Sequence, residues 1–314
     1  MRTTCRIIAL IAVAALTLGV SASRVPPDNP GRLVTFDVAV TDKNDNPVAG
    51  LQRKDFRVFE DDVEQTLTRF SVNREPLAIV VLVDFSNTFD YYRRDAIELA
   101  SGLIRNLGPD DWGAVVSFDV MPEIVTDFTH DKSALIGDLR GLQMPYFREA
   151  ALSDAVYFAL DRMKGLEQKR AILLLGTGFD TMSSKRTMVD ALKKAERSDT
   201  TIYTVSFAES TLLPIMENYP DPGARFRLSE AQNTLASFAE ASGGLSFTPM
   251  FPGQFRRIPE VVNADLRNQY TLSFVSHSTK DAGKLRKLRV VVSDTDLDQN
   301  GKPDKLRIRH KRGY

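Results

Sequence analysis

Cysteine and histidine are scarce in this chain of 314 residues, and their scarcity excludes several kinds of chemistry. Cys5 is the single cysteine, so the rest of the chain offers no thiol for catalysis, redox exchange or zinc binding. The three histidines are far apart, and neither a His-Glu-x-x-His pair nor a Gly-x-Ser-x-Gly turn occurs. We therefore predict that the protein is not an enzyme. A hydrolase with an unrecognised site is the catalytic alternative.

An excess of charge of either sign is also missing. Lys and Arg together number 41, and so do Asp and Glu. A neutral chain has no general electrostatic attraction to nucleic acid, so no nucleic-acid partner is expected. The length and the 43% of hydrophobic residues are typical of a globular protein with one large and one smaller domain.

Long hydrophobic runs are limited to the first residues. Arg2 and Arg6 precede an apolar stretch that begins at Ile7, and small residues follow it at Ser21 and Ala22. The stretch has about 14 residues, fewer than the roughly 20 that a spanning helix needs. We interpret residues 1–22 as a cleaved Sec-type signal peptide. The protein is then secreted or periplasmic and has no stable membrane span.

The remaining chain divides by its patterns. Residues 23–32 are rich in Pro and Gly and indicate a linker. Residues 33–75 alternate apolar and polar side chains and predict a small N-terminal β unit. Residues 251–314 contain three further predicted strands, at 269–276, 284–293 and 305–310. Because so few strands cannot make a core alone, we expect both ends of the chain to pair in one β-sandwich-like domain.

Residues 76–250 have a different pattern. Continuous apolar runs at 77–83, 114–118 and 171–175, with a more mixed one at 201–207, alternate with stretches of helical periodicity. This alternation predicts an α/β domain with a doubly wound, mostly parallel sheet of the Rossmann-like type, inserted in the β domain. In such a sheet, ligands bind at the carboxyl ends of the strands.

The first predicted α/β strand ends in a loop that carries Asp84, Ser86 and Thr88. One carboxylate and two hydroxyls are ligands that Mg²⁺ accepts. The same residue types also cap helices, so an alternative is that Ser86, Thr88 and Asp90 begin the next helix.

Asp84-x-Ser86-x-Thr88 resembles the metal-ion-dependent adhesion site, Asp-x-Ser-x-Ser, of von Willebrand factor A (VWA) domains. The resemblance continues at 111–118, 152–155 and 173–181. Residues 38–70 and 311–314 are similar to the flanks of exported bacterial VWA proteins of the acidobacterial type, so it covers nearly the whole mature chain. It implies a VWA fold and a protein partner bound at the strand ends.

The chain departs from the VWA pattern at two metal-ligand positions. Ala150 stands where the family has Thr, with Arg148 and Glu149 replacing small glycines, and Thr177 stands where the family has Asp. The ligand set that remains, Asp84, Ser86, Thr88, Thr177 and Asp180, predicts a degenerate site that binds Mg²⁺ weakly or not at all. Two alternatives stay open. Asp180 or Glu149 reaches inward and restores the site, or Arg148 pairs with Asp84 in place of the metal.

We therefore predict an exported protein–protein interaction or adhesion module. Its partner-binding face is expected to contain Asp84, Asn87, Phe89, Arg148, Glu149, Thr177 and Asp180. A Mg²⁺-dependent adhesin with an intact site is the first alternative. A scaffold for envelope assembly is the second.

Two further features lie near the end of the chain. A possible weak calcium loop contains Asp296, Asp298, Asn300 and Asp304, although Asn300-Gly301 alone is typical of a hairpin turn. Residues 280–314 hold 11 Lys or Arg against 5 Asp, a surplus of 6. This surplus is typical of the solvent-exposed face of an antiparallel strand pair. Alternatively, it forms a contact surface for an anionic envelope polymer.

Overall fold

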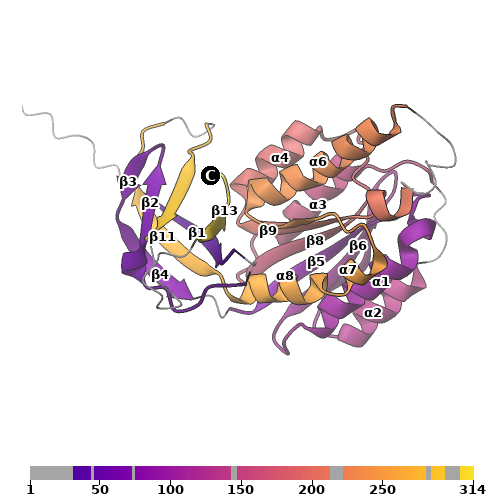
Figure 1. The fold of residues 1–314 in the computed structure, drawn as a ribbon, viewed down its shortest axis with the longest axis horizontal. Helices are drawn as coiled ribbons and strands as arrows, with labels where there is room; N and C mark the ends of the chain where they lie inside the picture. Colours follow the sequence, from indigo (N-terminus) through magenta and orange to yellow (C-terminus); the bar gives the residue numbers. More distant parts are fainter. Residues whose placement is uncertain are drawn as a thin grey trace, which may run out of the picture. The chain divides into compact units, whose positions relative to one another are not determined.

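The computed structural model describes residues 31–43, 46–72, 75–142, 147–212, 222–280, 284–293 and 305–314. Residues Gly31–Tyr314 form one compact unit that contains one mostly parallel sheet and two antiparallel sheets (Figure 1). The predicted signal peptide, most of the predicted linker and the predicted calcium loop (Asp296, Asp298, Asn300, Asp304) lie outside the described residues. Those interpretations stay predictions. None of the described helices is long and apolar enough to cross a membrane.

The mostly parallel sheet has six strands in the order β10-β9-β8-β5-β6-β7. The parallel strands are β5 (Leu77–Asp84), β6 (Trp112–Phe118), β8 (Lys169–Gly176), β9 (Thr200–Ser206) and β10 (Ser246–Phe247). The edge strand β7 (Pro122–Thr129) runs antiparallel to β6. With its first strand in the middle, the sheet is doubly wound, which confirms the predicted fold class.

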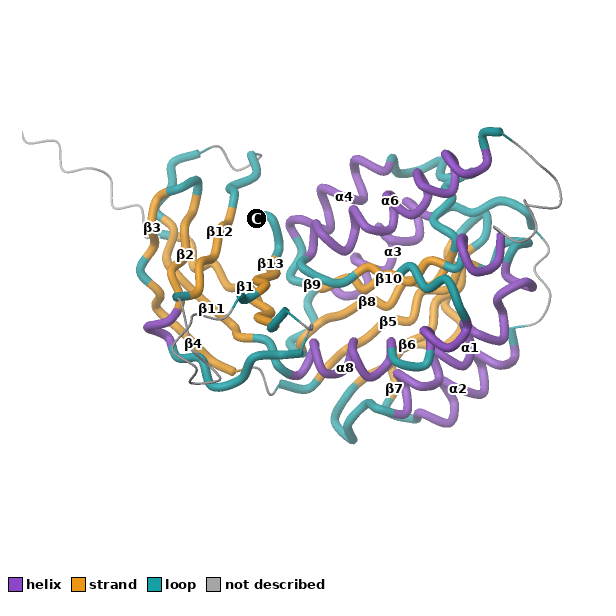
Figure 2. The backbone as a smooth tube through the Cα atoms, viewed as in Figure 1, coloured by secondary structure: helices purple, strands orange, loops and turns teal. Residues whose placement is uncertain are grey.

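Two layers of helices cover this sheet (Figure 2). One face packs against α1 (Phe89–Arg105), α2 (Lys132–Gly141), α7 (Pro252–Phe255) and α8 (Ile258–Arg267). The other packs against α3 (Leu152–Met163), α4 (Met188–Arg197) and α6 (Ala224–Ser242). In β5, Ile79 and Val81 face the first layer while Val80 and Leu82 face the second. Burial on both faces explains why these strands are apolar runs. A short π-helical segment, η2 (Ala208–Leu212), follows β9.

The helices α7 and α8 fall within the segment that the sequence analysis assigned to the C-terminal β unit. Phe255, Ile258 and Val262 join the α/β core, so this segment becomes β structure only at Tyr270. Pro252 and Pro259 obscure the helical pattern in the sequence. Both prolines lie in the first turn of their helices, where the missing N–H has no intrahelical partner to lose.

The remaining strands form two sheets that share one core. One sheet has the order β13-β1-β11-β4, with β13 (Arg307–His310), β1 (Arg32–Thr41), β11 (Tyr270–Ser276) and β4 (Leu67–Val72). The other has the order β12-β2-β3, with β12 (Leu288–Val292), β2 (Phe56–Glu60) and β3 (Val63–Gln65); a 3-10 turn, η1 (Arg53–Asp55), precedes β2. Their facing apolar side chains belong to a single cluster. Strands of the N-terminal segment thus pair with strands of the C-terminal segment, β1 with β11 and β13 and β2 with β12.

Charged contacts join the sandwich to the amino ends of the parallel strands. Lys169, the first residue of β8, lies 3.4 Å from Asp37 on β1, measured from Nζ to Oδ2. Lys311 forms an ion pair of 2.7 Å with Asp199, directly before β9. These contacts lie at the edge of the sheet where the parallel strands begin. The candidate site lies at the opposite edge, where the strands end.

Candidate functional site

The carboxylate of Asp84, the last residue of β5, is buried and hydrogen-bonded to neighbouring protein groups. Its side chain is only 1% exposed. Oδ1 accepts a hydrogen bond from the Ser86 N–H at 3.1 Å, and Oδ2 accepts from the N–H and the hydroxyl of Thr177 at 3.3 and 3.2 Å. Burial raises the pKa of Asp84 and outweighs the opposing effect of these hydrogen bonds. No cation contributes to this arrangement within the described part of the chain.

The structure places Ser86 beside the Asp84 carboxylate and Thr88 beside Ser86, without making either hydroxyl a helix cap. Their hydroxyl oxygens lie 3.2 Å apart, and the Ser86 side chain also interacts with Asp84. Thr88 occupies the N-cap position of α1 but makes no side-chain capping hydrogen bond. The capping alternative is therefore wrong for these hydroxyls.

Thr177 lies where the VWA resemblance requires a carboxylate. Its side chain is buried and donates its hydroxyl hydrogen to Asp84. The preceding Gly176 permits this contact, because a Cβ there would lie 2.6 Å from the Cβ of Asp84. A hydroxyl at this position stabilises the buried Asp84 but adds no second negative charge.

Asp180 serves a different element. Its Oδ2 accepts hydrogen bonds from the N–H of Ser153, at 3.2 Å, and from the Ser153 hydroxyl, at the start of α3. Its Oδ1 accepts from the Ser183 N–H at 3.3 Å. The N-cap residue of α3, Ala151, has no side chain that could do this. Asp180 thus caps α3 and, in this geometry, does not complete a site around Asp84.

Arg148 and Glu149 are exposed on the segment that leads into α3. Glu149 accepts a hydrogen bond from the backbone N–H of Arg148 at 3.1 Å. No ion pair joins Arg148 to Asp84, although the structure describes both residues. Arg148 therefore does not replace a metal in the way that the sequence interpretation allowed.

The residues present do not fit a Mg²⁺ site. Within the described ranges, no three His, Cys, Asp or Glu side chains come close enough together to hold a metal ion. Among the described residues, Asp84 is the single carboxylate of its cluster, and both of its carboxylate oxygens already accept hydrogen bonds from the protein. Mg²⁺ gives up its hydration shell reluctantly and needs strong anionic ligands to compensate.

The predicted partner-binding face needs one clear correction. Phe89 is fully buried, with its ring centroid 5.2 Å from that of Phe85 and 5.6 Å from that of Tyr92, so it belongs to the core. Asp84 and Thr177 are buried as well. The exposed members are Asn87, Arg148, Glu149 and Asp180.

Several exposed apolar side chains were not among the residues of the predicted face. Large hydrophobic residues are exposed in the loops and first helical turns that follow the parallel strands, and in the segment between α2 and α3, namely Tyr91, Met121, Met182, Phe226, Met250, Phe251 and Phe147. Sequence alone does not separate an exposed loop residue from one that packs down onto the domain. The polar residues on both sides of Met182, from Asp180 to Ser184, indicate a surface turn and are the signal in the sequence that favours an exposed Met182.

Internal anchors fix the loops of this face. Asp154, in the first turn of α3, accepts hydrogen bonds from the N–H groups of Ser184, Lys185 and Arg186 at 3.0, 3.2 and 2.6 Å. Gly178 has φ of +91°, and a Cβ there would lie 2.2 Å from the carbonyl oxygen of Ala231 on α6. The loop after β8 is thus hydrogen-bonded to α3 and lies close against α6.

Comparisons with known proteins find similar folds only. No protein-family model matches the chain, and no curated protein matches it. Among solved structures, a von Willebrand factor type A protein from Catenulispora acidiphila is 13% identical, with 88% of this chain and 72% of that chain covered and a TM-score of 0.49. BatB from Bacteroides thetaiotaomicron is 18% identical, with 59% and 97% covered and a TM-score of 0.45.

The vWF domain of the type V pili tip protein Mfa5 from Porphyromonas gingivalis is 14% identical, with 60% of this chain and 95% of that chain covered and a TM-score of 0.44. Identities this low concern the fold and not the ligand.

Proposed function

We propose that this protein is an exported binding module that captures a protein partner on the carboxyl-end face of its VWA-like sheet, without a metal ion. The observation that carries the proposal is the internal anchoring of the face. Asp84 is satisfied by Ser86 and Thr177, and Asp180 by Ser153. A loop surface that is already ordered loses little conformational entropy when it binds.

The exposed side chains on this face suit a protein partner. The carbonyl oxygen of Ala150 accepts hydrogen bonds from the N–H groups of Thr181 and Met182 at 2.9 and 3.1 Å, which joins the loop before α3 to the loop after β8. Phe147 and Met182 are both about half exposed on these joined loops. Aromatic and methionine side chains surrounded by polar groups are enriched at the centres of protein interfaces.

A pull-down with matched variants tests the proposal. The chain from Ser23 onward is immobilised and exposed to an envelope and secreted extract, with and without a chelator. We expect a specific partner that EDTA does not release and that Phe147→Ser/Met182→Ser loses by at least about tenfold, as removal of interface anchors does.

The control variant, Val63→Ser/Val72→Ser, removes exposed apolar side chains from the sandwich instead. It should retain the partner. Release of the partner by EDTA would favour the Mg²⁺-dependent adhesin. Equal loss in both double variants would show that the carboxyl-end face is not the binding surface.

A further inference from the structure

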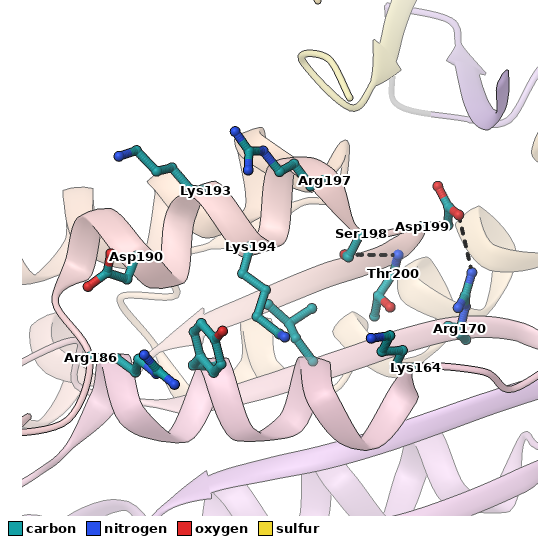
Figure 3. A pocket seen from close by; sticks show the side chains of 12 residues that line it. Lys164, Arg170, Arg186, Asp190, Lys193, Lys194, Arg197, Ser198, Asp199 and Thr200 are labelled. Carbon is teal, nitrogen blue, oxygen red and sulfur yellow. Dashed lines mark hydrogen bonds and ion pairs between the residues drawn. The ribbon is translucent and has the colours of Figure 1, made fainter. Parts of the chain in front are cut away.

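A basic groove lies between α3 and α4, and of the loop after β8 discussed above only Arg186 lines it. Its volume is about 520 Å³, and its lining contains six cationic side chains and two carboxylates: Lys164, Arg170, Arg186, Lys193, Lys194, Arg197, Asp190 and Asp199. Figure 3 shows that Lys194 and Lys164 point into the space between the two helices. A net excess of positive charge in a concave site favours an anionic ligand.

The two carboxylates of the groove are already engaged. Asp199 forms ion pairs with Arg170, at 3.4 Å, and with Lys311, at 2.7 Å. Asp190 accepts hydrogen bonds from the hydroxyl and the N–H of Thr187, at 2.7 and 3.1 Å, in the capping box of α4. Asp190 also attracts Arg186 and Lys193 electrostatically, but the six cations of the lining still outnumber its two carboxylates.

Three of these cations, Lys164, Arg186 and Lys193, make no ion pair with another described residue. Lys164, at the end of α3, is exposed, and so is Arg186, before α4. The Arg186 guanidinium lies 4.3 Å from the ring centroid of Tyr157. The Nζ atom of Lys194 lies 4.2 Å from the same centroid and forms an ion pair with Asp161. Stacking on Tyr157 holds Arg186 over the groove while leaving its N–H groups for a ligand.

The groove is long enough for several residues of an extended chain. Its cations run from Arg186, just before α4, to Arg197, the last residue of that ten-residue helix. A helix of this length measures about 15 Å, which is the span of four or five extended residues at about 3.3 Å each. A single phosphate-sized anion would occupy only part of this row.

At the end near Arg170, the groove opens toward residues of mixed charge. It shares Arg170, Ser198 and Asp199 with a second cavity of about 150 Å³ beside the sandwich. That cavity is lined by carboxylates as well as cations and hydroxyls, including Asp37, Glu75, Glu167, Lys169, Lys311 and Thr201. A uniformly anionic polymer would meet like charges there. A peptide that is acidic along the groove and polar or basic at one end would not.

We propose that the groove between α3 and α4 binds an acidic peptide segment of a partner protein. Carboxylates of the peptide contact Lys164 and Arg186, and its polar end enters the mixed cavity beside Lys169. This site is separate from the carboxyl-end face and adds a second point of attachment.

The test measures binding of a labelled hexaglutamate peptide that ends in Ser-Lys, by fluorescence anisotropy at low and at physiological salt. We expect saturable binding that weakens as salt increases. Lys164→Glu/Arg186→Glu should weaken it by at least about tenfold, because two attractive charges become repulsive. Arg53→Glu/Lys54→Glu, which makes the same change of charge on exposed residues of η1, should leave it unchanged.

No binding to the wild type, or equal loss in both double variants, would overturn the proposal. Equally tight binding of inorganic polyphosphate with the same sensitivity to Lys164→Glu/Arg186→Glu would overturn it in favour of an anionic polymer. If that variant does not fold, Lys164→Gln/Arg186→Gln replaces it, with the same expected direction. The pull-down partner of the carboxyl-end face should bind Lys164→Glu/Arg186→Glu normally, which keeps the two tests distinct.

Discussion

Replacing Asp111 by alanine is expected to lower the free energy of unfolding by about 3–5 kcal/mol, the usual cost of removing one partner of a buried ion pair. Asp111 is 3% exposed. It accepts hydrogen bonds from the N–H groups of Leu77, at 2.8 Å, and Gly108, at 2.5 Å, and pairs with Arg267 on α8. Alanine leaves two N–H groups and a guanidinium without this acceptor. Urea denaturation measures the effect.

The pH dependence of this loss is also predicted. Burial alone raises the pKa of Asp111, but the Leu77 and Gly108 N–H groups and Arg267 together hold it below its usual value. A lowered pKa stabilises the fold above the pKa of the unfolded chain, and this contribution disappears as the pH falls through the folded pKa. The difference between wild type and Asp111→Ala should therefore shrink as the pH falls below about 4.

Asp110→Ala is the matched control, because Asp110 is the exposed neighbour of Asp111. Its free energy of unfolding should stay within about 0.5 kcal/mol of the wild type. A loss of less than about 1 kcal/mol in Asp111→Ala would show that Asp111 does not hold β5 to the helix α8.

Lys169→Met is the second substitution with a large expected effect, also about 3–5 kcal/mol. Lys169 is 6% exposed, and its ammonium donates to the carbonyl oxygen of Leu266, at 3.0 Å, and to Gln269. Burial lowers the pKa of Lys169, and the nearby carboxylate of Asp37 partly offsets this. Methionine keeps most of the volume, so the loss reports the missing charge and hydrogen bonds. Thermal and urea unfolding measure it.

A double-mutant cycle with Asp37→Asn isolates the ion pair. In the Lys169→Met background the carboxylate of Asp37 has lost its partner, so neutralising it with Asp37→Asn removes an unbalanced charge. The double variant should therefore lose at least about 1 kcal/mol less than the sum of the single variants. Lys54→Met, on an exposed lysine, serves as the control for the substitution itself. Additive losses would mean that Lys169 and Asp37 do not stabilise the junction as a pair.

The fold followed from the sequence where burial imposed a simple pattern. The runs at 77–83 and 171–175 are apolar because β5 and β8 are covered on both faces, and they were predicted within one residue or two. The edge strand β7 was missed because its half-exposed side chains give neither a run nor a regular alternation, and its pairing with β6 is irregular. Helices α7 and α8 were missed because of their prolines.

The site was less predictable, because its residue types fit several roles. Asp84, Ser86, Thr88 and Thr177 do meet, as the motif indicated. Asp180 could have pointed toward Asp84 or toward α3, and the choice depends on Ala151, which leaves the α3 terminus without a side-chain cap. Phe89 could have been exposed or buried, and its position one helical turn from Tyr92 and beside Phe85 placed it in the core.

The central claim is that the carboxyl-end face is organised by the protein alone and not by a metal ion. Calorimetric titration of Mg²⁺ and Mn²⁺ into the purified chain from Ser23 onward tests it most directly, with Asp84→Ala as the reference. We predict no saturable heat in either protein, since Asp84 is the only carboxylate of its cluster among the described residues and both of its oxygens already accept protein hydrogen bonds. Saturable binding near micromolar metal that disappears in Asp84→Ala would contradict the claim and establish a functional metal-ion-dependent adhesion site.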